Sequence, residues 1–245
     1  MNARLYVVHG SHPCATVERA LQLKGIAYKV TEFPPPMHAA IMRARFGTRT
    51  VPLLKLDGEA ISGSRAILAK LDTLVPEPAL YPSDPDARAK VLEAEAWGDT
   101  DLQALTRRIL WPTFKAHPEA MATYSDGSKL PALPVPVLKA IAPVATRIEM
   151  KLNVATPDTY GPDVRSLPSK YDTVDAWIAD GVLGGATPNA ADLQIAASLR
   201  LLMTLADLRP ALESRPAGEL ALRLFPDFPG DVVAGSIPAE FLTTA

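Results

Sequence analysis

An apolar residue followed by proline, placed between strand-forming residues and a tight turn, is the feature that most constrains the fold of this chain. Residues 50–54 read TVPLL, and after an aspartate–glycine turn residues 63–67 read GSRAI. This spacing predicts a cis peptide bond before Pro52 that presents the backbone of Val51 to a ligand. Ser64 opens the next helix and would offer its hydroxyl and nearby N–H groups to a carboxylate. The local alternative is a trans proline on an edge strand, because few X-Pro bonds are cis.

The surrounding residues predict the order strand, helix, strand, helix, strand, strand, helix. A glycine breaks the first strand, and the helix that follows Ser11 ends at Lys24-Gly25, with a cation in its last turn and a glycine beyond it. Alternating apolar residues over 26–30 then predict a second strand, and a short helix over 37–45 precedes the Val-Pro strand. The last predicted helix of this part covers residues 64–74.

This order, with a polar residue opening the first helix and Val-Pro before the third strand, resembles the thioredoxin-like amino-terminal domain of the glutathione transferase family. Residues 182–193 read VLGGATPNAADL and resemble that family's signature at the core helix of its all-helical second domain. Asn189 would be the N-cap of this helix, with Asp192 completing a capping box. A competing interpretation caps the helix at Thr187, with Pro188 as its first residue.

The resemblance implies an α/β thioredoxin-like domain (βαβαββα) over residues 1–76 that binds glutathione. A proline-rich linker over 77–85 would join it to an all-α helical domain over 86–245 with an extended C-terminal tail. We expect this tail to cover a domain surface.

Within the second domain, Asp84-Pro85 predicts the start of a long helix that Pro112 stops or kinks. Two further helices are predicted over 137–152 and 171–179, and the Pro/Gly-rich residues 156–168 are predicted to form a connection.

Composition and charge indicate a globular chain long enough for two domains. It has 245 residues, of which 48% are hydrophobic and 21% charged, and its formal net charge is −2. Without a sustained Lys/Arg block, we expect neither nucleic acid nor an anionic membrane as a partner. The absence of a long apolar run and of a signal-like segment predicts cytoplasmic residence, and the single cysteine excludes an intrachain disulfide.

The resemblance implies a chemistry in which the glutathione thiolate attacks an electrophile. Ser11 matches the position that stabilises this thiolate in serine-type and cysteine-type members. A hydroxyl hydrogen bond to the charged sulfur contributes about 1.5–3 kcal/mol, more than the roughly 0.3–1 kcal/mol of a helix dipole. Val51 and Pro52 would pair with the cysteinyl unit, Ser64 would bind the γ-glutamyl carboxylate, and Arg65 would add charge at the rim.

Several positions leave alternatives open. Gly63 stands where the family usually has an acidic or amide side chain on the γ-glutamyl group, which predicts glutathione binding roughly ten- to hundred-fold weaker. Ser11 can be a simple N-cap, and His12 lines the thiol site as a neutral donor or faces solvent. Cys14 either packs as a small side chain or forms a mixed disulfide with glutathione. His9, His12 and Cys14 have no fourth partner, so we expect no metal.

Three functions follow. The leading one is a glutathione transferase that conjugates glutathione to, or isomerises, a hydrophobic electrophile in detoxification, and the resemblance implies that it acts as a homodimer. The second is a glutathione-dependent thiol oxidoreductase or peroxidase that works through Cys14. The third is a catalytically silent member of the fold that acts as a binding module. Glutathione is the co-substrate of the first two.

Overall fold

A four-stranded sheet forms the amino-terminal part of the structure, a computed structural model that describes residues 1–242. The strand order is β2-β1-β3-β4, with β1 parallel to β2 and antiparallel to β3, and β3 antiparallel to β4. The register pairs Leu5 of β1 with Val30 of β2 and with Leu54 of β3. The strands are β1 (Ala3–Val7), β2 (Tyr28–Glu32), β3 (Leu53–Leu56) and β4 (Glu59–Ser62).

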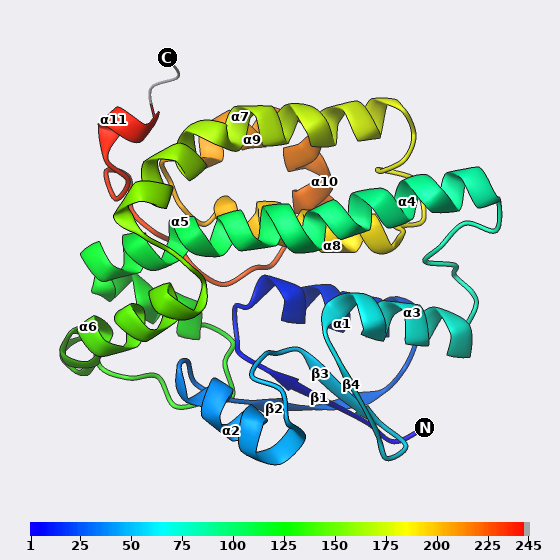
Figure 1. The fold of residues 1–245 in the computed structure, drawn as a ribbon, viewed down its shortest axis with the longest axis horizontal. Helices are drawn as coiled ribbons and strands as arrows, with labels where there is room; N and C mark the ends of the chain where they lie inside the picture. Colours follow the sequence, from blue (N-terminus) through cyan, green and yellow to red (C-terminus); the bar gives the residue numbers. More distant parts are fainter. Residues whose placement is uncertain (243–245) are drawn as a thin grey trace.

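Helices cover both faces of this sheet (Figure 1). α1 (His12–Leu23) and α3 (Ser64–Leu74) lie between the sheet and the remaining helices, and α2 (Met37–Phe46) lies on the opposite face. Alternation along the strands explains these layers, because successive side chains point to opposite faces. Leu5 and Leu54 belong to the main core, whereas Tyr6 and Leu53 pack with Met42 of α2. The predicted βαβαββα order is confirmed, although the second strand begins two residues later than predicted.

A buried lysine fixes the proline-rich connection between the two parts. Residues 75–84 form neither helix nor strand. Lys24 Nζ donates hydrogen bonds to the carbonyl oxygens of Val75 at 2.6 Å and Pro78 at 2.7 Å, and it pairs with Asp72 at 2.8 Å. The ammonium is therefore fully satisfied, as a buried charge must be.

A long, nearly continuous helical rod opens the second part (Figure 1). It consists of α4 (Pro85–Trp97), the π-helical turn η1 (Gly98–Leu102) and α5 (Gln103–Ala116). The predicted cap is confirmed, because the Asp84 carboxylate accepts a hydrogen bond from Ala87 N–H at 2.8 Å. The prediction that Pro112 stops the rod is wrong, since α5 continues to Ala116. Burial of Ile109 and its neighbours outweighs the one N–H that the proline removes.

The prediction for residues 156–168 is also wrong, because α7 (Pro157–Ala179) is helical through them. Thr156 and Thr159 form a capping box, with Pro157 at the first helical position. The two prolines inside α7 favour a connection locally, but buried Val164 and Leu167 hold this segment against the core. Tertiary packing therefore overrides the local helix-breaking tendency.

The signature helix α8 (Ala190–Leu202) runs through the centre of the second part, and nearly all of its residues are buried. Asn189 is its N-cap and Asp192 completes the capping box, so the first of the two predicted caps is confirmed. None of the described helices is long and apolar enough to cross a membrane. The other helices are η2 (Pro118–Ser125), α6 (Val135–Leu152), α9 (Arg209–Glu213), α10 (Pro216–Leu224) and α11 (Ala239–Leu242).

Candidate functional site

The hydroxyl of Ser11 does not cap the helix that Ser11 begins. Ser11 occupies the N-cap position of α1 with extended backbone, yet its side chain makes no cap hydrogen bond. Instead it hydrogen-bonds the thiol of Cys14 in the first turn. The side chain also lines a cavity of about 330 Å³. Ser11 therefore stands at the N-cap position, but its hydroxyl does not cap the helix and contacts the Cys14 thiol instead.

Cys14 lies beside Ser11 in the same cavity wall but is only 2% exposed. Burial raises the pKa of its thiol to about 12, and the hydrogen bond from Ser11 only partly opposes this effect. Because the thiolate is the reactive form, the side chain is an inert thiol at neutral pH. This environment supports the interpretation of Cys14 as a packed side chain.

The remaining wall of this cavity comes from distant parts of the chain. The turn after β1 and the outer face of α1 form one side, and residues 224–229, which begin at the last residue of α10, form the other. This part of the C-terminal stretch therefore lies beside α1. Glu18 lies in the wall, and burial raises the pKa of its carboxyl group.

The predicted glutathione-binding loop is held against the start of α3. The Val51-Pro52 peptide bond is cis, as predicted. The Pro52 carbonyl accepts a hydrogen bond from Gly63 N–H at 3.0 Å. The first bond within α3 runs from Ile67 N–H to the Gly63 carbonyl, so the N–H groups of residues 64–66 precede the intrahelical pattern. Gly63 has a φ of +90°, a backbone conformation that favours glycine over an acidic or amide residue.

Ser64 faces the helical part of the molecule. Its side chain is buried, and its Oγ accepts a hydrogen bond from Gln194 Nε2 of α8 at 3.1 Å. The same Nε2 donates to Asp99 of η1, also at 3.1 Å. The hydroxyl of Ser64 therefore joins the two parts of the protein while the neighbouring N–H groups begin α3.

Arg65 is paired rather than free. Its Nε lies 3.5 Å from Oε2 of Glu95 on α4, and the other oxygen of Glu95 accepts a hydrogen bond from Tyr81 at 2.8 Å. Burial is the main effect that raises the pKa of Glu95, and the guanidinium of Arg65 opposes it. Arg65 therefore forms an ion pair with Glu95 that links the two parts of the chain.

His12 points into the interface with α8, so the alternative that it faces solvent is wrong. Its Nδ1 lies 3.0 Å from Ser198 Oγ, and the Ser198 hydroxyl donates to the Gln194 carbonyl. Ser198 therefore accepts from Nδ1–H, which leaves Nε2 unprotonated. Burial lowers the pKa of His12 well below its usual value, with the positive charge of Arg107 adding to the effect. The imidazole is neutral near pH 7.

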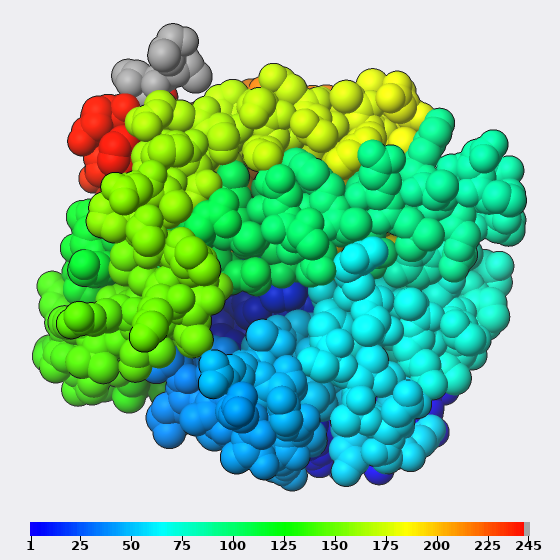
Figure 2. Space-filling model, in the orientation of Figure 1, coloured from blue at the N-terminus to red at the C-terminus, as the bar shows by residue number. Residues whose placement is uncertain are grey.

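The predicted residues thus form two groups. Ser11 and Cys14 share the cavity at the start of α1, and the Val51-Pro52 loop contacts the start of α3. His12 and Ser64 each reach α8, where Ser198 and Gln194 lie one turn apart. Figure 2 shows a hollow between the green α5–α6 region and the light blue α2 region, with the dark blue of the first residues at its floor.

Sequence reasoning missed the polar partners on α8 and η1. The apolar residues around Gln194 and Ser198 indicate a buried structural helix, and this pattern hides the two polar side chains. Their spacing of four residues on an otherwise buried helix was the available signal. No comparable signal marked Asp99, because the π-helical turn alters which side chains share a face of the rod.

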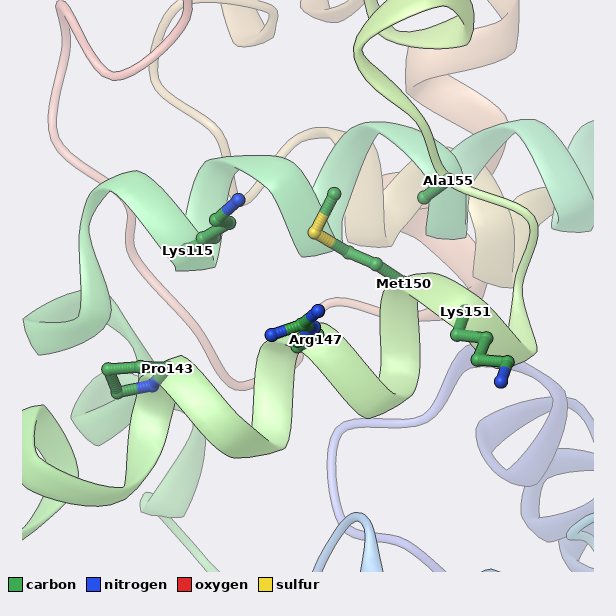
Figure 3. Close-up of a pocket in the computed structure, with 6 residues that line it drawn as sticks. All are labelled: Lys115, Pro143, Arg147, Met150, Lys151 and Ala155. Atoms are coloured by element: carbon green, nitrogen blue, oxygen red, sulfur yellow. The ribbon is translucent and has the colours of Figure 1, made fainter.

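A larger cavity of about 700 Å³ lies between α5 and α6 (Figure 3). Three cationic side chains line it, together with the side chains or backbone of three uncharged residues. The cations are Lys115, Arg147 and Lys151, and the uncharged residues are Pro143, Met150 and Ala155. No sequence motif marks this cavity, because Lys115 is distant in the chain from the other two cations.

Glu149, on the buried face of α6, carries a carboxyl group that strongly resists ionisation. Its Oε1 lies 3.9 Å from His38 of α2, and burial raises the pKa of Glu149 to about 7. In the unfolded chain the pKa is about 4.5, so folding favours the protonated acid. This contribution to stability is present below about pH 4.5 and is lost as pH rises through 7.

We therefore expect Glu149→Gln to raise the free energy of unfolding by about 2 kcal/mol at pH 8, and by well under about 1 kcal/mol at pH 5. Glutamine keeps the shape and an acceptor for Asn153 without the ionisation. Urea unfolding at both pH values measures the difference. Glu93→Gln on the exposed side of α4 is the control and should change neither value. A pH-independent effect of Glu149→Gln would contradict the assigned cause.

A thioredoxin-like sheet joined to a helical part with a central capped helix is the architecture of the glutathione S-transferases. Residues 5–79 match the family model for the glutathione S-transferase, N-terminal domain. That part of the chain is therefore similar to the N-terminal domain of the glutathione S-transferases. A search of characterised protein sequences found no match.

Solved structures extend the likeness to nearly the whole chain. A glutathione S-transferase from Rhodospirillum rubrum shares 18% identity, with 98% of each chain covered and a TM-score of 0.56. The β-etherase LigF from a Sphingobium species shares 16% identity, with 91% of this chain and 99% of that chain covered and a TM-score of 0.61. A maleylacetoacetate isomerase from Anaeromyxobacter dehalogenans with bound glutathione shares 22% identity, with 91% and 89% covered and a TM-score of 0.52. The chain has the glutathione S-transferase fold.

Proposed function

We propose that this protein is a glutathione-dependent transferase or isomerase that acts on a hydrophobic electrophile. Ser11 is the thiolate-stabilising residue of the proposal. The observation that carries it is the Ser11 hydroxyl at the start of α1, which makes no cap hydrogen bond to the helix that it begins. Glutathione as co-substrate is supported by the family match of residues 5–79 and by the glutathione-bound isomerase of the same fold.

In this proposal, the sulfur of glutathione accepts a hydrogen bond from the Ser11 hydroxyl, which lowers the pKa of the bound thiol. The backbone of Val51-Pro52 pairs with the cysteinyl unit. The N–H groups at the start of α3, beginning with Ser64, bind the γ-glutamyl carboxylate. Arg65 and His12 support the site indirectly, through the Glu95 and Ser198 contacts that join the two parts of the molecule. The proposal also includes that the protein is cytoplasmic and forms a homodimer.

We expect Ser11→Ala to lower kcat/KM about ten-fold, because one hydrogen bond to a charged sulfur contributes about 1.5 kcal/mol. The assay follows glutathione conjugation to 1-chloro-2,4-dinitrobenzene across a pH series. The pKa of enzyme-bound glutathione should rise by about one unit in the variant. Ser83→Ala, at an exposed serine of the connection, is the control.

Two further measurements separate the alternatives. If Cys14→Ala abolished turnover while Ser11→Ala preserved it, the thiol oxidoreductase would be favoured and the proposal would fail. If calorimetric titration detected no glutathione binding to the wild-type protein, the catalytically silent module would be favoured. The weak binding expected from Gly63 sets the glutathione concentrations for that titration in the millimolar range.

A further inference from the structure

The outer face of α6 exposes an uninterrupted line of large aliphatic side chains. Of the 14 exposed large hydrophobic residues among residues 1–242, eight lie between positions 133 and 154. Five of these form what we call the α6 stripe, at the spacing of one helix face, and they are 41–65% exposed. Such a concentration marks an interaction surface, whereas single exposed aliphatics do not. The α6 stripe consists of Val137, Ile141, Val144, Ile148 and Leu152.

A line of positive charge runs beside the α6 stripe. Arg147 and Lys151 of α6 and Lys115 of α5 line the 700 Å³ cavity, and Figure 3 shows them along the two neighbouring helices. We call these three residues the cationic flank. Within the described residues, no acidic group lies within 4.0 Å of any of them in an ion pair. The one acidic residue of α6 is Glu149, which is buried on the opposite side. The exposed surface of α6 therefore combines apolar and positive groups without negative ones.

Charge argues against a second copy of the chain as the partner. In a two-fold pair whose symmetry axis is perpendicular to both α6 helices, the helices are antiparallel and the same flank of each faces its counterpart. The cationic flanks would then face one another, and like charges at such a seam are repulsive. The third cation of α6, Lys139, is partly neutralised by Glu119 at 3.4 Å and does not change this balance. An anionic partner matches the flank.

We propose that α6 docks on the surface of an anionic phospholipid bilayer. The α6 stripe enters the boundary between headgroups and acyl chains, and the cationic flank lies against lipid phosphates. A helix with an apolar face bordered by Lys and Arg is suited to this interfacial position and does not need to span the bilayer. The earlier expectation that excluded an anionic membrane depended on the charge of the whole chain. Folding instead brings Lys115 beside Arg147 and Lys151.

Vesicle flotation with the full-length protein tests the proposal. We expect binding to vesicles of phosphatidylglycerol and phosphatidylcholine, little binding to phosphatidylcholine alone, and release at high salt. The double variant R147Q/K151Q should lower the partition coefficient about 30-fold, which corresponds to a factor of about five per charge. The triple variant I141Q/V144Q/I148Q should reduce binding to background. All of these positions are exposed, so circular dichroism should show an unchanged fold.

Val233→Gln is the matched control, because this aliphatic side chain is 67% exposed outside α6. It should bind vesicles as the wild-type protein does. Equal binding to neutral and anionic vesicles would overturn the proposal, as would full binding by the triple variant. A wild-type dimer that the triple variant converts to monomer, without any vesicle binding, would assign the α6 stripe to a second copy and would also overturn it.

Discussion

Asp192→Ala is expected to lower the free energy of unfolding by about 3–5 kcal/mol, the largest effect of any substitution considered for this protein. The Asp192 side chain is fully buried and accepts hydrogen bonds from Gly184 N–H at 2.8 Å and Asn189 N–H at 2.9 Å. Alanine would leave both N–H groups unsatisfied at the start of α8. Each hydrogen bond to a charged acceptor contributes about 1.5–3 kcal/mol.

Guanidinium unfolding at pH 7 measures this loss. Asp192→Asn keeps the volume and one acceptor oxygen, so it should cost roughly half as much. Asp180→Ala removes an exposed carboxylate at the end of α7 and should change stability by less than about 0.5 kcal/mol. A loss below about 1 kcal/mol for Asp192→Ala would show that the loop before α8 rearranges to satisfy both N–H groups.

Gly218→Ala should destabilise the protein by about 3 kcal/mol, although alanine is the better helix former by about 1 kcal/mol. A Cβ at position 218 of α10 would lie 2.1 Å from the Leu212 carbonyl oxygen and 2.8 Å from its carbon. These are backbone atoms of α9, so a change of side-chain rotamer cannot relieve the overlap. The short connection between α9 and α10 must move instead.

Thermal unfolding compared with Gly185→Ala tests this explanation. At position 185 the nearest atom to a new Cβ is a backbone oxygen at 3.5 Å, which is ordinary contact. The control should therefore leave the midpoint nearly unchanged. Equal midpoints for both variants would mean that α10 shifts away from α9 without cost, and that close packing of these helices contributes little to stability.

Local sequence signals predicted the parts of the fold in which a side chain interacts with the backbone of nearby residues. Asp84 and Asn189 cap their helices as expected, and the Val51-Pro52 segment has the predicted geometry. α7 shows the limit of such signals. Its prolines disfavour helix locally, but packing of buried residues such as Val164 on the core decides the outcome, and packing partners are not visible in the sequence.

The candidate site was predictable to a similar extent. Ser11 and the start of α3 could be predicted as site residues, because their places follow from the order of strands and helices along the chain. The partners of His12 and Ser64 on α8 depend on how two parts of the chain meet, and they lie 186 and 130 residues away. The burial that makes Cys14 inert likewise depends on the assembled core rather than on its neighbours in the chain.

The hydrogen bonds of Lys24 have a consequence for motion. The Lys24 ammonium, at the end of α1, holds the start of the connection between the two halves beside α3. The first residues of the connection are therefore fixed to the first half and do not act as a free hinge. The Ser11 cavity lies between α1 of the first half and residues 224–229 of the second, so its width depends on how firmly the connection between the halves is held.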